Sequence, residues 1–477
     1  KAAIHRIGGD EMNRFKTERL AELIATQSPD GAITVFSGVP GYWDNHDQAY
    51  MIQAFVQDHR YCGNENALQA ALKLGNFLVN RGTAVTLGLE TAFLMLSEES
   101  GDSRFSDYCR DVFKLDQSIN AYDRMTPVNG VAHVYTWIAR CLAQLQYMKL
   151  TGNDTALLRE GTQELYRRVF SDYSSISGSC SGAYGCCSQQ AVMCSSVSCV
   201  CSGGFFWGEL WDDTQIGLGK WGETCASAYL LRCTAKYLEF EADPRLGDLY
   251  ERVMYNAFFG AQSEDGLRQR YFIPFNEPGE WYEHETYCCP NNLRRMMFEL
   301  SDAIYFKTPD GIAVNLYTDS ALTIPNAVIH QKTDYPESET VEFTISARKV
   351  FTLTLRIPGW CKHAVVQGKS VSAGWFNMEI PEGETHITLQ LPMEVRQIRG
   401  NMAQAGRIAL LRGPLVYAVE MERNQLSGHA MDLLTIDNTK PFSVTPKGIE
   451  TTCLIPNQDH LERKVLFTRF SCEKRTR

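Results

Sequence analysis

The stretch FKTPDGIAVNLYT, residues 306–318, marks the point where the hydrophobic pattern of this chain changes its period. Before it, apolar residues recur at the spacing of a helix. After it, they alternate with polar residues as they do in strands, and Pro309 and Gly311 supply the break between the two patterns. We therefore expect a multidomain α and β protein with a boundary near 306–312.

The N-terminal part reads as helices in series. Residues 65–82, 131–153 and 223–262 carry apolar residues at 3.6 spacing, and Asp243-Pro244 divides the last of these segments. Because no strands are interleaved, the pattern favours a helical barrel or toroid over residues 1–308.

The C-terminal part reads as closely spaced strands. Alternating or β-branched runs occupy 311–318, 339–347, 350–360, 385–398 and 407–420. They predict an antiparallel β-sandwich over 309–424. Residues 425–477 form a mixed β segment whose organisation the pattern does not define.

Cysteine is abundant, and its distribution is uneven. The chain has 16 cysteines, and six of them lie in the Ser/Gly-rich segment 171–204 (Cys180, Cys186, Cys187, Cys194, Cys199 and Cys201). This segment has no clear period, so we interpret it as an irregular excursion. Its cysteines could bind a second metal, form disulfides or serve as small residues, and we favour the readings without a metal.

Charge and hydropathy exclude several classes of protein. The formal net charge is -10 and the pI is about 5.6, which argues against binding to nucleic acid or an anionic membrane. No apolar run approaches the length of a membrane span. The sequence RIGGDE lacks the strand and helix context of a nucleotide-binding loop. The chain shows no signal peptide and falls quickly into a helical pattern without an initial Met, so we expect it to begin inside a domain.

Two short motifs together offer the ligands of a metal site. Glu223 and Cys225 flank Thr224 where a helix is predicted to begin, and Cys288 and Cys289 are adjacent. One oxygen and three sulfurs make the number of ligands that tetrahedral zinc requires. With 62 residues between the motifs, the spacing is not that of a zinc finger. The alternative is that these cysteines are buried apolar residues that pack together.

Other polar residues could contact a substrate or the metal ligands. Glu209 lies among aromatic residues that include Trp207, and such surroundings disfavour the charged form of a carboxyl group, as a general acid requires. The alternative is an ordinary exposed glutamate between core aromatics. His133 interrupts an apolar helix, His46 lies among polar and aromatic groups, and His284 and Glu285 could support the adjacent cysteines.

Taken together, these residues resemble glycoside hydrolase family 127, the β-L-arabinofuranosidase family. The resemblance is carried by GETCAS (222–227), YCCPNNLRR (287–295), FTLTLRIPGW (351–360) and ALLRGPLVYAVE (409–420), in that order. It implies an (α/α) six-hairpin barrel followed by β-sandwich domains, with the N-terminal part of the barrel missing from this chain. It also implies a zinc ion held by Glu223, Cys225, Cys288 and Cys289.

The resemblance implies the roles of the remaining residues. Cys288 would be the nucleophile and Glu209 the general acid/base of a retaining glycosidase. His133 matches a substrate-contacting histidine of the family, and His46 lies near another such position but out of register. We add Trp207 as a residue that could lie against a sugar face. The Cys/Ser/Gly segment before Glu209 departs from the family pattern and leaves the alignment of Glu209 open.

The expected partner is an oligosaccharide or glycoconjugate substrate, without nucleic acid or membrane, and a homodimer is left open. Free thiolates favour the reducing cytoplasm, while a periplasmic or secreted location is not excluded. Two other classes stay open. One is a sugar-binding or structural zinc protein, and the other is an (α/α)-barrel lyase or unsaturated-glycoside hydrolase that works without zinc.

Overall fold

The computed structural model describes residues 9–34, 42–83, 88–117, 134–170, 222–273, 280–283, 288–399, 406–426, 434–454 and 462–469. Contacts along the chain divide it into two compact units, Lys1–Arg167 and Arg168–Arg477. No described helix is long and apolar enough to cross a lipid bilayer.

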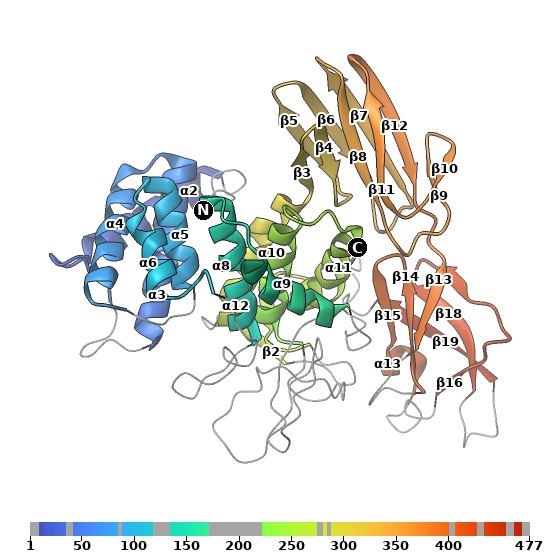
Figure 1. Ribbon diagram of the computed structural model, residues 1–477. Coiled ribbons are helices and arrows are strands. Elements are labelled where there is room, and N and C mark those ends of the chain that lie inside the picture. The colour runs from blue at the N-terminus through green and yellow to red at the C-terminus, as the bar shows by residue number, and fades with distance from the viewer. Residues whose placement is uncertain are drawn as a thin grey trace. The chain divides into compact units, whose positions relative to one another are not determined.

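The N-terminal unit is helical in its described ranges (Figure 1). Its helices are α2 (Gly9–Ala25), α3 (Tyr42–Cys62), α4 (Glu65–Asn80), α5 (Leu89–Ser100), α6 (Arg104–Asp111), α8 (Val134–Thr151) and α9 (Ala156–Val169), the last of which runs across the end of the unit. Helix α3 packs against α4 and α5, and α5 packs against α8. The predicted helix at 65–82 is confirmed as α4, whose first turn is capped by the Asn64 side chain, which accepts from the backbone N–H of Ala67.

The second unit begins with helices and continues as sheets. Its first elements are α10 (Thr224–Tyr237), α11 (Pro244–Arg252), a π-helical turn η1 (Val253–Phe258), strands β1 (Arg268–Arg270) and β2 (Trp281–Glu283), α12 (Cys288–Glu299) and a 3₁₀ turn η2 (Leu300–Ala303). The predicted break at Asp243-Pro244 is confirmed, because Asp243 caps α11 and Pro244 occupies its first turn.

The predicted change from helices to strands is also confirmed, and two facing sheets follow the helices. One sheet has the order β10-β9-β12-β7-β6-β5 and the other β11-β8-β4-β3. Their strands are β3 (Tyr305–Thr308), β4 (Gly311–Val314), β5 (Ser320–Ile324), β6 (Ala327–Lys332), β7 (Thr340–Ala347), β8 (Phe351–Ile357), β9 (Ala364–Val366), β10 (Lys369–Val371), β11 (Gly374–Ile380) and β12 (Gly383–Gln390).

The two sheets enclose an apolar core that includes Phe343 and Leu355. One strand pair departs from the predicted antiparallel arrangement, because β4 and β8 run parallel. The chain leaves β4 to form β5, β6 and β7 of the other sheet before it returns as β8, and such a crossover permits parallel pairing.

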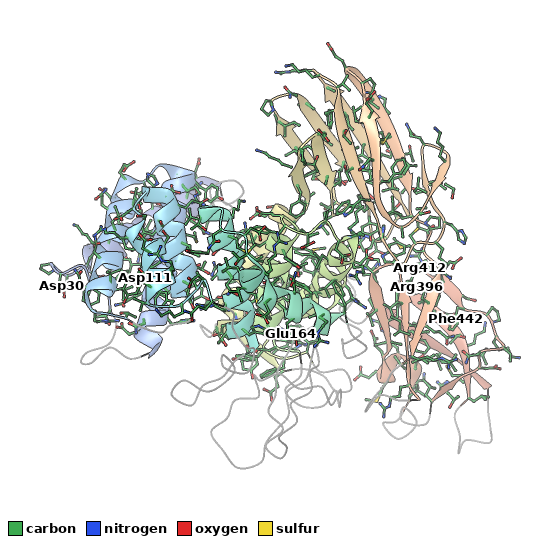
Figure 2. All side chains as sticks on the ribbon, viewed as in Figure 1. Asp30, Asp111, Glu164, Arg396, Arg412 and Phe442 are labelled. Atoms are coloured by element: carbon green, nitrogen blue, oxygen red, sulfur yellow. The ribbon has the colours of Figure 1, made fainter. Side chains whose placement is uncertain are left out.

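A further sheet follows the sandwich. It is formed by β13 (Val395–Arg399), β14 (Ile408–Arg412), β15 (Leu415–Val419), β16 (Thr435–Ile436), β17 (Ser443–Thr445), β18 (Gly448–Leu454) and β19 (Glu462–Arg469), with a short helix α13 (Met421–Asn424) after β15. Because β15 pairs with β19, this sheet lies on both sides of residue 424, where the sequence pattern placed the end of the sandwich. Arg396 on β13 and Arg412 on β14 lie where this sheet meets the sandwich, and Arg412 donates to Glu339 over 2.6 Å (Figure 2).

A buried charge cluster joins α11 to the sandwich. The Arg356 side chain on β8 is fully buried and forms ion pairs of 2.5 Å with Asp248 and 2.7 Å with Glu251. Gly247 leaves room for this guanidinium, since a Cβ at that position would lie 2.3 Å from Arg356 Cδ. One turn further along, Asn256 donates to Pro414 O and accepts from Val416 N, so α11 and η1 contact both β regions.

Candidate metal centre and active site

The first part of the site lies at the start of α10. Gly222 adopts a positive φ of 70°, which a residue with a side chain rarely adopts, and Glu223 then occupies the N-cap position. Thr224 holds the start of the helix against the end of β1, because its backbone N–H donates to Tyr271 O and its hydroxyl donates to Arg270 O. Cys225 follows in the first turn and is fully buried.

The second part lies at the start of α12, where Cys288 and Cys289 begin the helix. Helices α10 and α12 pack together. Glu299 at the end of α12 links the two helices, because it accepts a hydrogen bond from Arg232 of α10 over 2.5 Å. It also accepts one from Arg295 of its own helix over 3.0 Å. This packing brings two segments that are remote in sequence to one place.

Four potential ligand atoms meet between these helices. One atom from each of Glu223, Cys225, Cys288 and Cys289 lies within 4.8 Å of the other three. The Cys289 thiol donates to Glu223 Oε1 over 3.6 Å. Glu223, Cys225 and Cys289 are fully buried, whereas Cys288 is partly exposed. Three of the four potential ligands are therefore shielded from solvent, whereas a solute can reach the Cys288 sulfur.

The chemistry of this donor set fits a metal ion. Burial raises the pKa of Cys225 and of Cys289 well above the ordinary thiol value, and their sulfur neighbours raise the pKa of Cys225 further. Among the described residues, the four potential ligand atoms that lie within 4.8 Å of one another are one carboxylate oxygen and three sulfurs. A cation is the partner that would make three thiolates favourable here, and three sulfurs with one oxygen are ligands that zinc accepts.

Each of the three sulfurs also has a hydrogen-bonding group from the chain. The Tyr271 hydroxyl lies 3.2 Å from Cys288 Sγ, the backbone N–H of Cys225 donates to Cys289 Sγ over 3.3 Å, and Asn292 Nδ2 donates to Cys225 Sγ over 3.3 Å. The sequence pattern did not identify Tyr271 or Asn292. Asn292 could have been found, because it lies one helical turn after Cys288, whereas no signal pointed to Tyr271.

The other residues predicted for the site are divided between described and undescribed parts of the chain. His46 lies on α3 in the N-terminal unit, with its Nδ1 3.6 Å from Asp47 and its ring 4.8 Å from that of Tyr50. The remaining predicted residues, together with the Cys-rich segment 171–204, lie outside the described residues; they are His133, Trp207, Glu209, His284 and Glu285.

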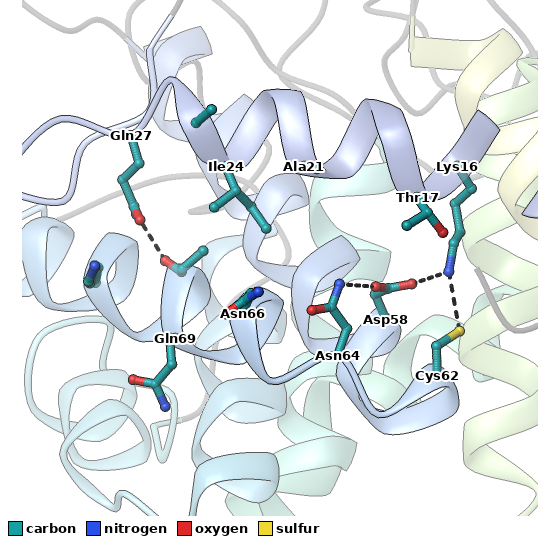
Figure 3. A pocket seen from close by; sticks show the side chains of 13 residues that line it. Lys16, Thr17, Ala21, Ile24, Gln27, Asp58, Cys62, Asn64, Asn66 and Gln69 are labelled. Atoms are coloured by element: carbon teal, nitrogen blue, oxygen red, sulfur yellow. Dashed lines mark hydrogen bonds and ion pairs between the residues drawn. The ribbon is translucent and has the colours of Figure 1, made fainter. Parts of the chain in front are cut away.

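A cavity of about 590 Å³ lies in the N-terminal unit, between α2 and the helices α3 and α4 (Figure 3). At one end Lys16 binds Asp58 and lies 3.3 Å from Cys62 Sγ, and Asn64 donates to the same carboxylate. These polar side chains bind one another, and none of them was predicted for the site.

Two family models match the chain. The one described as "Beta-L-arabinofuranosidase, GH127 catalytic domain" matches residues 10–302, and the one described as "Beta-L-arabinofuranosidase, GH127 middle domain" matches residues 311–393. A non-reducing end β-L-arabinofuranosidase of Bifidobacterium longum subsp. longum is 25% identical over 479 residues, which cover 85% of this chain and 72% of that protein.

Solved structures resemble the chain over nearly its whole length. The crystal structure of a family 127 β-L-arabinofuranosidase from Geobacillus stearothermophilus T6 has a TM-score of 0.75 at 21% identity and covers 97% of this chain and 84% of that one. A second structure, a family 127 β-arabinofuranosidase, has a TM-score of 0.79 at 19% identity and covers 98% of this chain and 83% of that one. At these sequence identities the similarity shows the fold alone. It agrees with the order of elements in this chain, in which helices are followed by a β-rich region.

Proposed function

The chain belongs to glycoside hydrolase family 127 and is a glycosidase, and we propose that it is a retaining enzyme that releases L-arabinofuranose, or a related sugar, from β-linked glycans. The observation that carries the proposal is the meeting of Glu223, Cys225, Cys288 and Cys289 within 4.8 Å, with only Cys288 partly exposed. The related β-L-arabinofuranosidase of Bifidobacterium longum supports the choice of sugar.

We assign these four residues as the ligands of one zinc ion. When bound, zinc supplies the positive charge that keeps the Cys288 sulfur a thiolate at neutral pH and that stabilises the same sulfur when it leaves. Glu223, Cys225 and Cys289 are fully buried, as ligands that only hold a metal can be. Cys288 is partly exposed, as a sulfur that reacts with a substrate must be.

Cys288 is the nucleophile in this proposal. Its sulfur forms a bond to the anomeric carbon while the bond from that carbon to the departing oxygen breaks, and a glycosyl-enzyme results. The Tyr271 hydroxyl, 3.2 Å from the sulfur, fixes the direction in which Cys288 points. A water molecule then forms a bond to the anomeric carbon as the carbon–sulfur bond breaks, and two inversions retain the configuration.

Glu209 is the general acid/base. It gives its proton to the departing glycosidic oxygen in the first step and takes a proton from the attacking water in the second. The aromatic residues around it in the sequence, including Trp207, favour the protonated form that the first step needs. His133, His46 and Trp207 are proposed substrate contacts.

We propose that the helices form the (α/α) barrel that the family resemblance implies, with the catalytic domain ending near residue 308. The second boundary is moved from 424 to the segment between Gln390 and Val395, because the strands from β13 to β19 belong to one sheet. The partners and the location follow the sequence-based expectation of a glycan substrate, with neither nucleic acid nor membrane, and a homodimer left open. A cytoplasmic location is proposed because thiolate ligands favour a reducing compartment.

Hydrolysis of an aryl β-L-arabinofuranoside tests the proposal. Cys288→Ser should abolish turnover and Glu209→Gln should lower it by about 100- to 10,000-fold, as expected for loss of an acid/base. Cys62→Ser, at another partly exposed cysteine, and Glu264→Gln, at an exposed glutamate, serve as matched controls and should keep full activity. Turnover that survives in Cys288→Ser would rule out the covalent role.

A further inference from the structure

The charge of the proposed metal centre requires compensation beyond the metal. Three thiolates and one carboxylate carry four negative charges, and a divalent cation neutralises two of them. The remaining charge lies among residues that are almost wholly buried, where a charge is costly unless hydrogen bonds stabilise it. The hydrogen bonds that reach the sulfurs are therefore part of the energetics of the site.

Asn292 supplies one of these hydrogen bonds from a position that helix geometry explains. It follows Cys289 by three residues and Cys288 by four on α12, so it lies on the same face of the helix one turn further along. Its Nδ2 donates across the helix interface to Cys225 Sγ on α10, over 3.3 Å. Only 5% of Asn292 is exposed, so water does not readily replace this donor.

The three sulfurs differ in the kind of group that contacts them. Cys289 accepts a hydrogen bond from a backbone N–H, which a side-chain substitution does not remove. Cys288 is contacted by the Tyr271 hydroxyl, and either the hydroxyl or the thiol can be the donor in that contact. Cys225 accepts from a neutral side-chain amide that can only donate through its nitrogen. Asn292 is thus the side chain whose removal takes one donor from one sulfur without touching the proposed nucleophile.

We propose that Asn292 is a positioning residue of the metal centre, whose amide N–H holds the Cys225 sulfur toward the metal and stabilises its negative charge. The inference rests on the zinc site of the proposed function. A hydrogen bond to a ligating sulfur withdraws electron density from it and fixes its direction, and the loss of such an outer partner typically lowers metal affinity by about 10- to 100-fold.

The test compares Asn292→Ala and Asn292→Asp with Asn291→Ala and Asn291→Asp. Asn291 lies next to Asn292 on α12 but is exposed, so it controls for the same substitutions in the same helix. In competition with a zinc chelator, both Asn292 variants should lose zinc at a chelator concentration about 10- to 100-fold lower than the wild type does. Asn292→Asp should be affected at least as strongly, because it replaces the donor with a carboxylate of similar shape that adds a further negative charge next to the Cys225 sulfur. The Asn291 variants should match the wild type.

A spectroscopic measurement separates positioning from a general loss of stability. With cobalt(II) in place of zinc, removal of the hydrogen bond raises the energy of the sulfur electrons, so the sulfur-to-cobalt charge-transfer band of Asn292→Ala should move to longer wavelength. If Asn292→Ala does not fold, Asn292→Asp keeps the shape of the side chain and takes its place in both measurements.

The outcomes distinguish this inference from the proposed function. A wild-type chain that holds no zinc contradicts the proposed function itself. A wild-type chain that holds zinc, together with Asn292 variants that hold it equally tightly and show an unchanged cobalt band, overturns the inference alone. Weaker metal retention with a shifted band, seen only at position 292, supports it.

Discussion

Replacement of Arg356 by methionine should destabilise the second unit strongly. The Arg356 side chain is fully buried and is ion-paired with Asp248 at 2.5 Å and with Glu251 at 2.7 Å. Methionine would fill much of the space but leave two carboxyl groups without their cation. Breaking a buried pair by removal of one partner costs about 3–5 kcal/mol, a large share of the roughly 5–15 kcal/mol by which a protein is stable.

Urea unfolding at pH 7 measures this loss. With a slope of about 2 kcal/mol per molar urea, the midpoint should fall by about 1.5–2.5 M. Arg348→Met, at an exposed arginine between β7 and β8, is the matched control and should change stability by no more than about 0.5 kcal/mol. The triple variant Asp248→Asn, Glu251→Gln, Arg356→Met should recover most of the loss, because the two carboxyl groups that lose the Arg356 cation are then neutral amides. A midpoint for Arg356→Met within about 0.5 M of the wild type would refute the assignment of this cluster as a buried charge centre.

Three further perturbations test other parts of the structure. Burial raises the pKa of Glu251 from its usual 4.5 to about 7, so between these pH values the folded state binds a proton that the unfolded state has released. The free energy of unfolding should therefore fall by up to about 3 kcal/mol as the pH rises from 4.5 to 7, and it should stay constant above pH 7. Glu251→Gln should remove this pH dependence, as measured by urea unfolding at a series of pH values. Asn256→Ala leaves Pro414 O and Val416 N without their buried partner and should cost about 2–4 kcal/mol by urea unfolding, whereas a loss below about 1 kcal/mol would contradict this role. Cys225→Ala should abolish zinc binding by metal analysis while Cys233→Ala, on the same helix, retains it, and equal zinc contents would contradict the ligand assignment.

Much of the fold could be predicted from the sequence, because apolar residues recur over long segments at the spacing of either a helix or a strand. The helical segments, the break at Asp243-Pro244 and the change to strands after residue 306 all depend on local patterns. The parallel pairing of β4 with β8 and the sheet that spans residue 424 could not be predicted, because they depend on which remote strands meet. A strand shows its own alternation but does not identify its neighbour.

The site could be predicted only as two separate motifs. The residue types of Glu223 with Cys225 and of Cys288 with Cys289 indicate a metal, but only the packing of α10 against α12 brings them within 4.8 Å. Asn292 follows from helix periodicity once Cys288 is known to begin a helix, whereas Tyr271 reaches Cys288 through the loop after β1 and leaves no pattern. The roles of Glu209, Trp207 and His133 stay predictions, because these residues lie outside the described ranges.

X-ray absorption at the zinc edge, measured on the purified full chain, tests the metal centre most directly. Three cysteines and one glutamate predict about one zinc per chain, with three sulfur neighbours at about 2.3 Å and one oxygen neighbour at about 2.0–2.2 Å. Replacement of Cys288 by serine should reduce the sulfur neighbours from three to two. A chain without zinc, or a zinc ion surrounded only by nitrogen and oxygen, would contradict the account.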